Sequence, residues 1–347
     1  MRHPDIWSLP GPRRFIDDLT SRMYKGRCIN LRDRHGAEGI LTALFSQLTR
    51  DSFVRVHSID LSNAVEVLPA LNEVLATNFS SLAALSAHET TQNTVFLLKV
   101  AGSVLSRDLQ NFVRAARLRA GSDPGVIVTA SSGLVEGLSG ENWDVVDAIG
   151  LIAPLDGMAF AATRLSEGES LPVRVKAAIA VEVGGWDLFL TEKLLALPFK
   201  EAMRPDLNLI RWADATILSS ASQLDRWGGE VSPHSAWLAQ QDKDRLTKRV
   251  WRGQLAALFP WIEECRREVV ARNHRVLQPD NRTMKDIDEL DWGPLCIQLE
   301  RSSNGCPPVA RRARAIRNSL AHGVPVSWSD ISNCIAEYTN WSGSRSV

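Results

Sequence analysis

The chain lacks the cysteine pattern of a disulfide-stabilised or zinc-binding protein. Its 347 residues include only five cysteines, an odd number, and none lies in a Cys-x-x-Cys pair: Cys28, Cys265, Cys296, Cys306 and Cys334. A disulfide framework uses an even number of cysteines, and a zinc ribbon uses closely spaced pairs. We therefore expect neither a disulfide framework nor a bound metal.

Long apolar runs and a net charge are also missing. No apolar run reaches the roughly 20 residues that a membrane-spanning helix needs. The first residues, Met-Arg-His-Pro-Asp, lack the apolar segment of a signal peptide, so we expect a cytoplasmic protein with no membrane partner. Lysine plus arginine number 40, as do aspartate plus glutamate, so the whole chain exerts no strong electrostatic pull on nucleic acid.

The charges that are present are distributed unevenly. From His234 onward there are 17 basic and 13 acidic side chains, whereas the preceding 233 residues hold 23 and 27. Three arginines of one short segment, Arg311, Arg312 and Arg314, precede a fourth, Arg317. A local basic patch can bind phosphate although the net charge is zero, so we predict that Arg311, Arg312 and Arg314 bind RNA. The alternative is a solvated helix face.

The first part of the chain alternates between strand and helix patterns. The third apolar run, at 94–98, is apolar throughout, as in a strand that is buried on both faces. Such alternation predicts an α/β domain with a parallel sheet between two layers of helices. The expected strands lie at 27–31, 54–59, 94–98, 125–129 and 149–152, and the expected helices at 14–23, 40–48, 68–78 and 105–119.

The rest of the chain is expected to be helical. Trp251, Leu255, Leu258 and Ile262 form an amphipathic stripe at i, i+4, i+7 and i+11. Gly228-Gly229 suggests a linker before this helix. We predict three domains, at 1–155, 156–230 and 231–347, with other helices at 158–162, 173–183, 186–197, 206–218, 292–299, 311–322 and 328–341.

The layout of residues 9–165 resembles the P-loop NTPase core, in particular the AAA-like and STAND-like ATPases of bacterial defence loci. The residues that handle the nucleotide are missing, however. The turn Gly36-Ala37-Glu38-Gly39 has no Gly-Lys-Thr to hold phosphate and magnesium, and the third strand ends in Leu98-Lys99 instead of an acid. We therefore expect a degenerate P-loop-like domain, a pseudo-ATPase without a cofactor. The helical middle resembles the lid of such ATPases; the alternative is a bundle that links two domains.

Near the end of the chain, one helix carries Arg317, Asn318 and His322 and stops at Gly323. Ile316 and Leu320 are four residues apart and face the core. Arg317 and His322 are five apart, which separates them by roughly 140° around an ideal helix. They converge only if the helix ends near His322, and Gly323 provides such an end.

The sequence Arg-Asn-x-x-x-His resembles the Arg-x4–6-His signature of the HEPN superfamily, over about the last 115 residues. The resemblance implies an all-α domain that cleaves RNA without a metal, at a site formed in a homodimer. In that site Arg317 would hold the phosphate, His322 would transfer a proton, and Asn318 would position the substrate. The alternative is that His322 caps the helix while Arg317 forms a surface ion pair.

Two functions follow from these resemblances. The first is a HEPN-type ribonuclease or toxin, regulated by the pseudo-ATPase domain, in antiphage defence. The second is a non-catalytic assembly or adaptor subunit that binds other defence-system subunits. The intact Arg317-Asn318 and His322 pattern favours the first, and the missing P-loop residues favour the second, so the sequence leaves open whether the chain is an enzyme.

Overall fold

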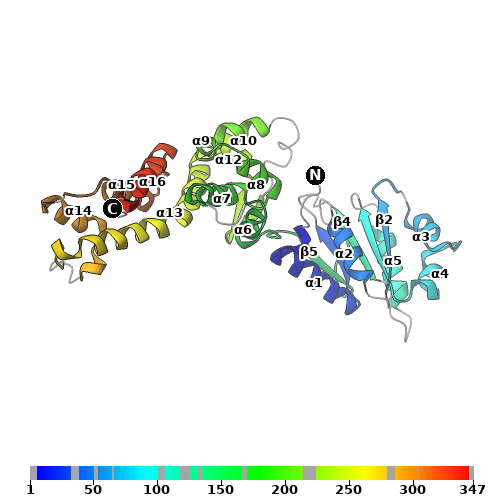
Figure 1. Cartoon of the computed structure of the whole chain (residues 1–347). Helices are drawn as coiled ribbons and strands as arrows, with labels where there is room; N and C mark the ends of the chain where they lie inside the picture. The colour runs from blue at the N-terminus through cyan, green and yellow to red at the C-terminus, as the bar shows by residue number, and fades with distance from the viewer. Residues whose placement is uncertain are drawn as a thin grey trace. The chain divides into compact units, whose positions relative to one another are not determined.

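The chain forms two compact units, residues 1–152 and 153–347 (Figure 1). The first division lies three residues from the expected boundary at 155, and the further division at 230 stays a prediction. This computed structural model describes residues 6–32, 39–50, 54–64, 66–100, 106–117, 126–131, 135–165, 170–213, 224–279, 286–303 and 305–343.

The first unit is built on one five-stranded sheet in which every neighbouring pair is parallel. The strands follow the order β2-β3-β4-β1-β5, so β4 lies between β1 and β3. The unit therefore has an α/β fold with a parallel sheet, as expected from the sequence. The strands are β1 (Cys28–Arg32), β2 (Arg55–Leu61), β3 (Thr94–Val100), β4 (Val126–Ser131) and β5 (Trp143–Asp147).

Helices cover both faces of this sheet, as the alternation predicts. On β3, Val95 and Leu97 pack against α1 (Pro10–Tyr24) and α2 (Ile40–Leu48), while Phe96 and Leu98 pack on the opposite face. The side chains of a strand point alternately to its two faces, so this apolar strand supplies both cores. The opposite face is covered by α3 (Val67–Leu75), α4 (Leu82–Ser86) and α5 (Ser106–Arg117).

The predicted fifth strand at 149–152 is wrong. The fifth strand is β5, which runs parallel to β1 from the pair Cys28–Trp143 to the pair Arg32–Asp147. It lies at the edge of the sheet, where Trp143 is buried but Val145 is 48% exposed. An edge strand needs fewer apolar residues than a central one. The sequence pattern of β5 is therefore weaker than that of the apolar run at 149–152, where the strand was expected.

The second unit is helical apart from one short hairpin. The helix predicted at 206–218 ends at Trp212 in the structure, and its last residues lie outside the described ranges. No helix of the described chain is long and apolar enough to cross a membrane. The elements are α6 (Pro154–Ala162), α7 (Leu171–Gly184), α8 (Leu188–Leu195), α9 (Phe199–Ala202), α10 (Asp206–Trp212), β6 (Leu224–Trp227), β7 (Glu230–Pro233), α12 (Ser235–Gln241), α13 (Lys243–Asn273), α14 (Trp292–Arg301), α15 (Pro308–Ala321) and α16 (Trp328–Gly343).

Gly228-Gly229 is a hairpin turn, and the prediction of a linker at this point is wrong. The two glycines join β6 to β7 with φ of 60° and 89°, a combination that glycine adopts without strain. Trp227, just before the turn, is buried. One apolar cluster, with members from Val175 to Cys334, extends on both sides of the hairpin, so the chain stays within one unit here.

Helices α7 and α13 cross at close range in the helical unit. A Cβ atom placed on Gly253 of α13 would lie 2.6 Å from the Cα atom of Ile179 on α7. Ile179 is buried, with Val250 and Leu258 of α13 in the same apolar cluster. Only a residue without a side chain allows the two backbones to pack at this distance.

We expect Gly253→Ala to lower the free energy of unfolding by about 1–3 kcal/mol, because the new methyl group overlaps the backbone of α7. Gly293→Ala on α14 is the matched control. Its Cβ meets no atom within 4 Å, so the change should be neutral or slightly stabilising. Urea unfolding of both variants measures the difference, and equal stability would contradict the close crossing.

Candidate functional site

The helix that carries the Arg-Asn-x-x-x-His motif ends where the sequence predicts. Its apolar face is buried, including Ile316 and Leu320. The helix ends at Ala321, His322 follows as its C-cap, and Gly323 has a φ of 77°. The N–H of Val324 donates to the carbonyl of Ser319 at 2.9 Å, which satisfies a terminal carbonyl of the helix.

Helix α13 holds this helix end and the segment after it. The indole Nε1 of Trp251 donates to the carbonyl of Leu320 at 2.7 Å. The buried amide of Gln254 donates to the carbonyl of Val326 at 2.8 Å and accepts from its N–H at 2.6 Å. Two side chains of one helix therefore determine how the chain leaves the motif.

The three predicted catalytic residues lie on the last turns of α15 and its cap. Asn318 and His322 are exposed, and Arg317 is half-buried. Across the described residues, none of these three side chains takes part in a hydrogen bond or an ion pair. The surface ion pair that the alternative interpretation gives to Arg317 is therefore not found there. Their catalytic roles stay a prediction.

The three predicted RNA-binding arginines differ in what they contact. Arg311 lies 3.6 Å from a carboxylate oxygen of Glu300, and Arg312 lies 2.5 Å from Glu337. Both arginines are exposed, and such surface pairs contribute only about 0–1 kcal/mol, so phosphate can compete with them. Arg314 is half-buried and interacts with the thiol of Cys296. RNA binding by these arginines stays a prediction.

Lys99 lies near the carboxyl end of β3, where the P-loop resemblance would require a magnesium-binding acid. Lys99 faces Asp60 of β2 in the strand register, and its ammonium lies 3.0 Å from the Asp60 carboxylate. Hydrogen bonds from Ser62 and from Lys99 lower the pKa of Asp60 to about 2. The Asp60 carboxylate therefore already has partners, in the local turn at Ser62 and in Lys99. Most of the turn in which a degenerate P-loop is expected, residues 33–38, lies outside the described residues.

A cavity of about 590 Å³ lies beside the first turns of α2 in the same unit. Trp7, Arg13, Gly39 and Arg50 are among its lining residues. Two cations and an indole suit a small aromatic anion. The lysine and hydroxyl that bind a magnesium triphosphate in a P-loop are nevertheless missing from the chain.

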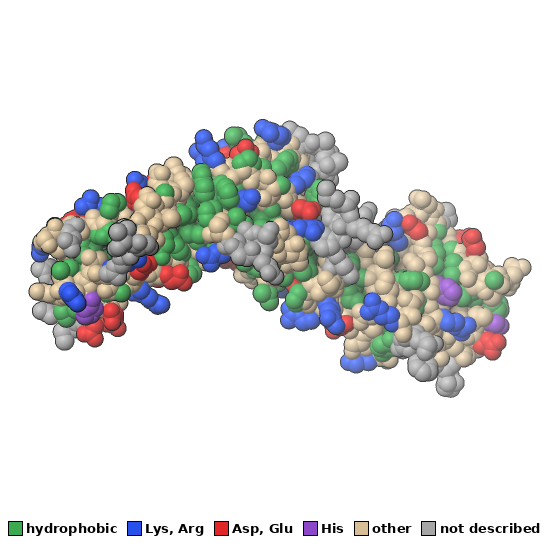
Figure 2. All heavy atoms as spheres, viewed as in Figure 1, with side chains coloured by type: hydrophobic (Ala, Val, Ile, Leu, Met, Phe, Trp, Pro, Cys, Tyr) green, Lys and Arg blue, Asp and Glu red, His purple; other side chains and the backbone are tan. Residues whose placement is uncertain are grey.

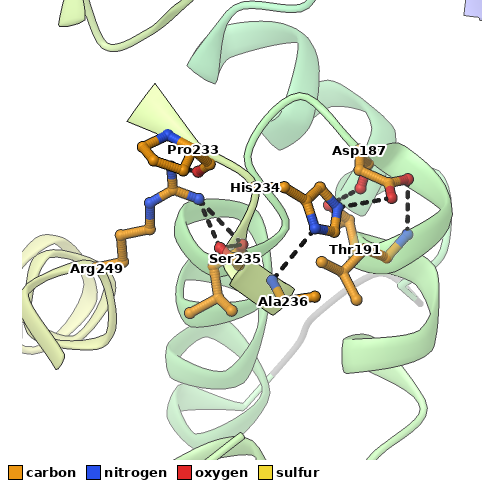
Figure 3. A network of polar contacts seen from close by, with 9 residues as sticks. Asp187, Thr191, Pro233, His234, Ser235, Ala236 and Arg249 are labelled. Carbon is orange, nitrogen blue, oxygen red and sulfur yellow. Dashed lines mark hydrogen bonds and ion pairs between the residues drawn. The ribbon is translucent and has the colours of Figure 1, made fainter. Parts of the chain in front are cut away.

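A buried polar network in the helical unit was not predicted from the sequence (Figure 3). At its centre, Arg249 of α13 is only 5% exposed. Its guanidinium donates to the hydroxyls of Ser235 at 2.6 Å and Ser232 at 2.9 Å, and to the carbonyl of Pro233 at 3.1 Å. Burial lowers the pKa of Arg249 to about 10, although the charge of Glu182 opposes the effect. No carboxylate of the described chain bonds to it directly.

An acid–histidine pair lies beside this arginine (Figure 3). The Nδ1 of His234 accepts from the N–H of Ala236 at 3.2 Å, so the proton of the ring is on Nε2, 3.1 Å from Asp187. Burial alone would raise the pKa of Asp187, but the hydrogen bond from His234 and those from backbone N–H groups lower it overall. Asp187 also caps α8 through the N–H of Leu190 at 3.0 Å. Its capping pattern is a local signal, whereas its partner His234 lies 47 residues away.

The lowered pKa of Asp187 makes a pH-dependent contribution to stability. The folded-state pKa lies below the ordinary 3.8, so the contribution is present above pH 3.8 and is lost as the pH falls through the folded value. We expect wild type to exceed Asp187→Asn in unfolding free energy at pH 7, with the difference shrinking below pH 4. Urea titrations of both proteins from pH 3 to 7 measure it; a constant difference would show that the carboxylate charge has no part.

Comparisons with known proteins add little to this geometry. No family model matches the chain, and no curated protein matches it. Among solved structures it is similar to Cdc6p from Pyrobaculum aerophilum, with 14% identity, a TM-score of 0.37, and coverage of 97% of this chain and 96% of that one. The α/β assignment therefore depends on the strand order and register described above.

Proposed function

We propose that the chain is a metal-independent endoribonuclease whose helical unit carries the chemistry and whose P-loop-like unit regulates it without hydrolysing a nucleotide. The observation that carries this proposal is the state of the motif. Arg317, Asn318 and His322 gather at one helix end, and the described chain supplies no partner for their side chains. A surface ion pair of Arg317 would have such a partner, whereas His322 caps the helix through its backbone N–H and leaves its imidazole unused.

The chemistry uses these side chains as a cation and a proton carrier. The imidazole of His322 removes the proton of a 2′-hydroxyl, whose oxygen attacks the adjacent phosphorus. The bond to the 5′-oxygen breaks, and this leaving oxygen takes the proton back from the imidazolium. Arg317 stabilises the charge that develops on the phosphate, and Asn318 orients the ribose. The products are a 2′,3′-cyclic phosphate and a 5′-hydroxyl, and no step needs a metal.

The site takes residues from two copies of the chain. The two motif residues are separated around the helix, and His322 is exposed on the surface of the unit. A second copy that covers this surface would exclude water and bring a further arginine and histidine to the phosphate. Homodimerisation of the helical unit is thus part of this proposal.

We expect His322→Ala and Arg317→Ala each to lower the rate of RNA cleavage by about 10²–10⁴, with little change in melting temperature. Wild type should cleave labelled single-stranded RNA in EDTA and leave cyclic-phosphate ends. Gel analysis of the products measures both.

Exposed residues of the same unit provide matched controls for these variants. His274→Ala and Arg267→Ala remove an exposed histidine and an exposed arginine far from the motif in sequence, and they should cleave as wild type does. Mixing Arg317→Ala with His322→Ala protein should recover activity if two copies share a site. Full activity of His322→Ala would refute the proposal.

The second candidate function is a non-catalytic adaptor, and one observation favours it. Lys99 pairs with Asp60 where a P-loop ATPase would need a free acid, which supports an α/β unit that does not hydrolyse ATP. If wild type cleaves no RNA, both units act as binding surfaces for the subunits of a larger complex, for example one in antiphage defence, as the family resemblance implies.

Both functions predict that the chain binds no Mg-ATP with micromolar affinity, because it has no P-loop lysine, hydroxyl or magnesium-binding acid. Calorimetric titration of the full chain with Mg-ATP should give no saturable heat. A magnesium-dependent micromolar site that disappears in Arg13→Gln, beside α2, would contradict this expectation.

A further inference from the structure

A second cavity, in the helical unit, has no role in the site above. Its volume is about 820 Å³, within the range of about 300–1,000 Å³ that ligand sites occupy. Its walls come from α9, α10, the start of α13 and the segment 325–329. We name it the α9–α13 groove.

The rim of this groove is cationic. Lys200, Arg204 and Lys243 line it and are exposed, and none of them forms an ion pair within the described part of the chain. Asp206 is the acidic residue among the lining side chains. On the face drawn in Figure 2, lysines and arginines lie among acids over both units, in keeping with the zero net charge. Three unpaired cations around one cavity therefore mark a local site for an anion.

The floor and one wall of the groove suit a planar ring. Met203, Leu246 and Val326 give an apolar floor. Trp328 is half-buried in the wall and stacks on Phe199, with ring centroids 4.8 Å apart and an angle of 12°. Cations that follow a backbone, together with an aromatic platform, are the combination with which proteins bind single-stranded nucleic acid.

One wall of the groove follows the motif closely in sequence. Its wall at Pro325 begins two residues after Gly323, where the motif helix has ended. The double hydrogen bond between Gln254 and Val326 holds this wall against α13, the helix whose first residues also line the groove. An RNA strand bound at His322 would therefore need to follow only this short segment to reach the cationic groove.

We propose that the α9–α13 groove binds single-stranded RNA next to the scissile phosphate, with phosphates at Lys200, Arg204 and Lys243 and a base against Trp328. This inference rests on the proposed ribonuclease function, since that function places the strand at His322. The groove determines substrate affinity and the length of RNA that is engaged, and it takes no part in proton transfer.

The test uses the full chain and a fluorescent 12-nucleotide oligouridylate. The variant Lys200→Gln/Arg204→Gln/Lys243→Gln should weaken binding at least 10-fold at low salt. Its slope of log K against log salt should fall by about 2, because each lost phosphate contact removes about 0.7 from the slope. The control Lys248→Gln/Arg267→Gln/Arg275→Gln removes three exposed cations outside the groove and should bind as wild type does.

The outcomes separate this inference from the proposed function. If wild type cleaves RNA, a groove variant with a raised KM and an unchanged kcat supports the groove. If wild type binds RNA without cutting it, weaker RNA binding by the groove variant supports the groove. Equal binding by the groove variant and wild type overturns the groove, even if His322→Ala abolishes cleavage. An equal loss of RNA affinity in the control variant also overturns the groove. Binding of uridine monophosphate without binding of the oligouridylate overturns it as well. Melting temperatures verify that all variants are folded.

Discussion

The crossing of α7 and α13 is the contact on which the helical unit depends. Gly253 lets the two backbones meet, and the neighbouring side chains of α13 then reach in different directions. Arg249 bonds to the end of the hairpin and the start of α12, whereas Trp251 and Gln254 bond to the chain that leaves α15. One helix therefore connects the buried network with the end of the motif helix, because all of these side chains lie within two turns.

The α/β unit is stabilised by contacts within its own chain. Its sheet is held by the alternating apolar side chains of β3 and by a buried amide on β1. Asn30 donates to the carbonyls of Val135 and Leu138 at 2.9 and 3.0 Å, and it accepts from the N–H of Val135. At the carboxyl edge of the sheet, Lys99 pairs with Asp60 across β3 and β2.

Both proposals meet on one short segment of chain. His322 lies at its start, and Pro325 to Ser329 form a wall of the α9–α13 groove. Because Gln254 holds Val326 by both its N–H and its carbonyl, the segment cannot shift without leaving buried polar groups unpaired. The same two hydrogen bonds would then hold the substrate-binding groove and the proton-transferring His322 in fixed positions relative to each other.

Local spacing alone determined much of this protein: the α/β class, the helix at 40–48, and the motif helix with its end at Gly323 follow from patterns within a few residues. Tertiary structure decided what no local pattern records. β5 is an edge strand although its sequence carries charged residues, and Gly228-Gly229 form a hairpin turn where the sequence suggests a linker. Arg249 meets its hydroxyl partners because α13 packs beside the hairpin and α12, and the lysines at 200 and 243 line one cavity although they are 43 residues apart. Such contacts join residues far apart in sequence, and their energies depend on burial that only the folded chain creates.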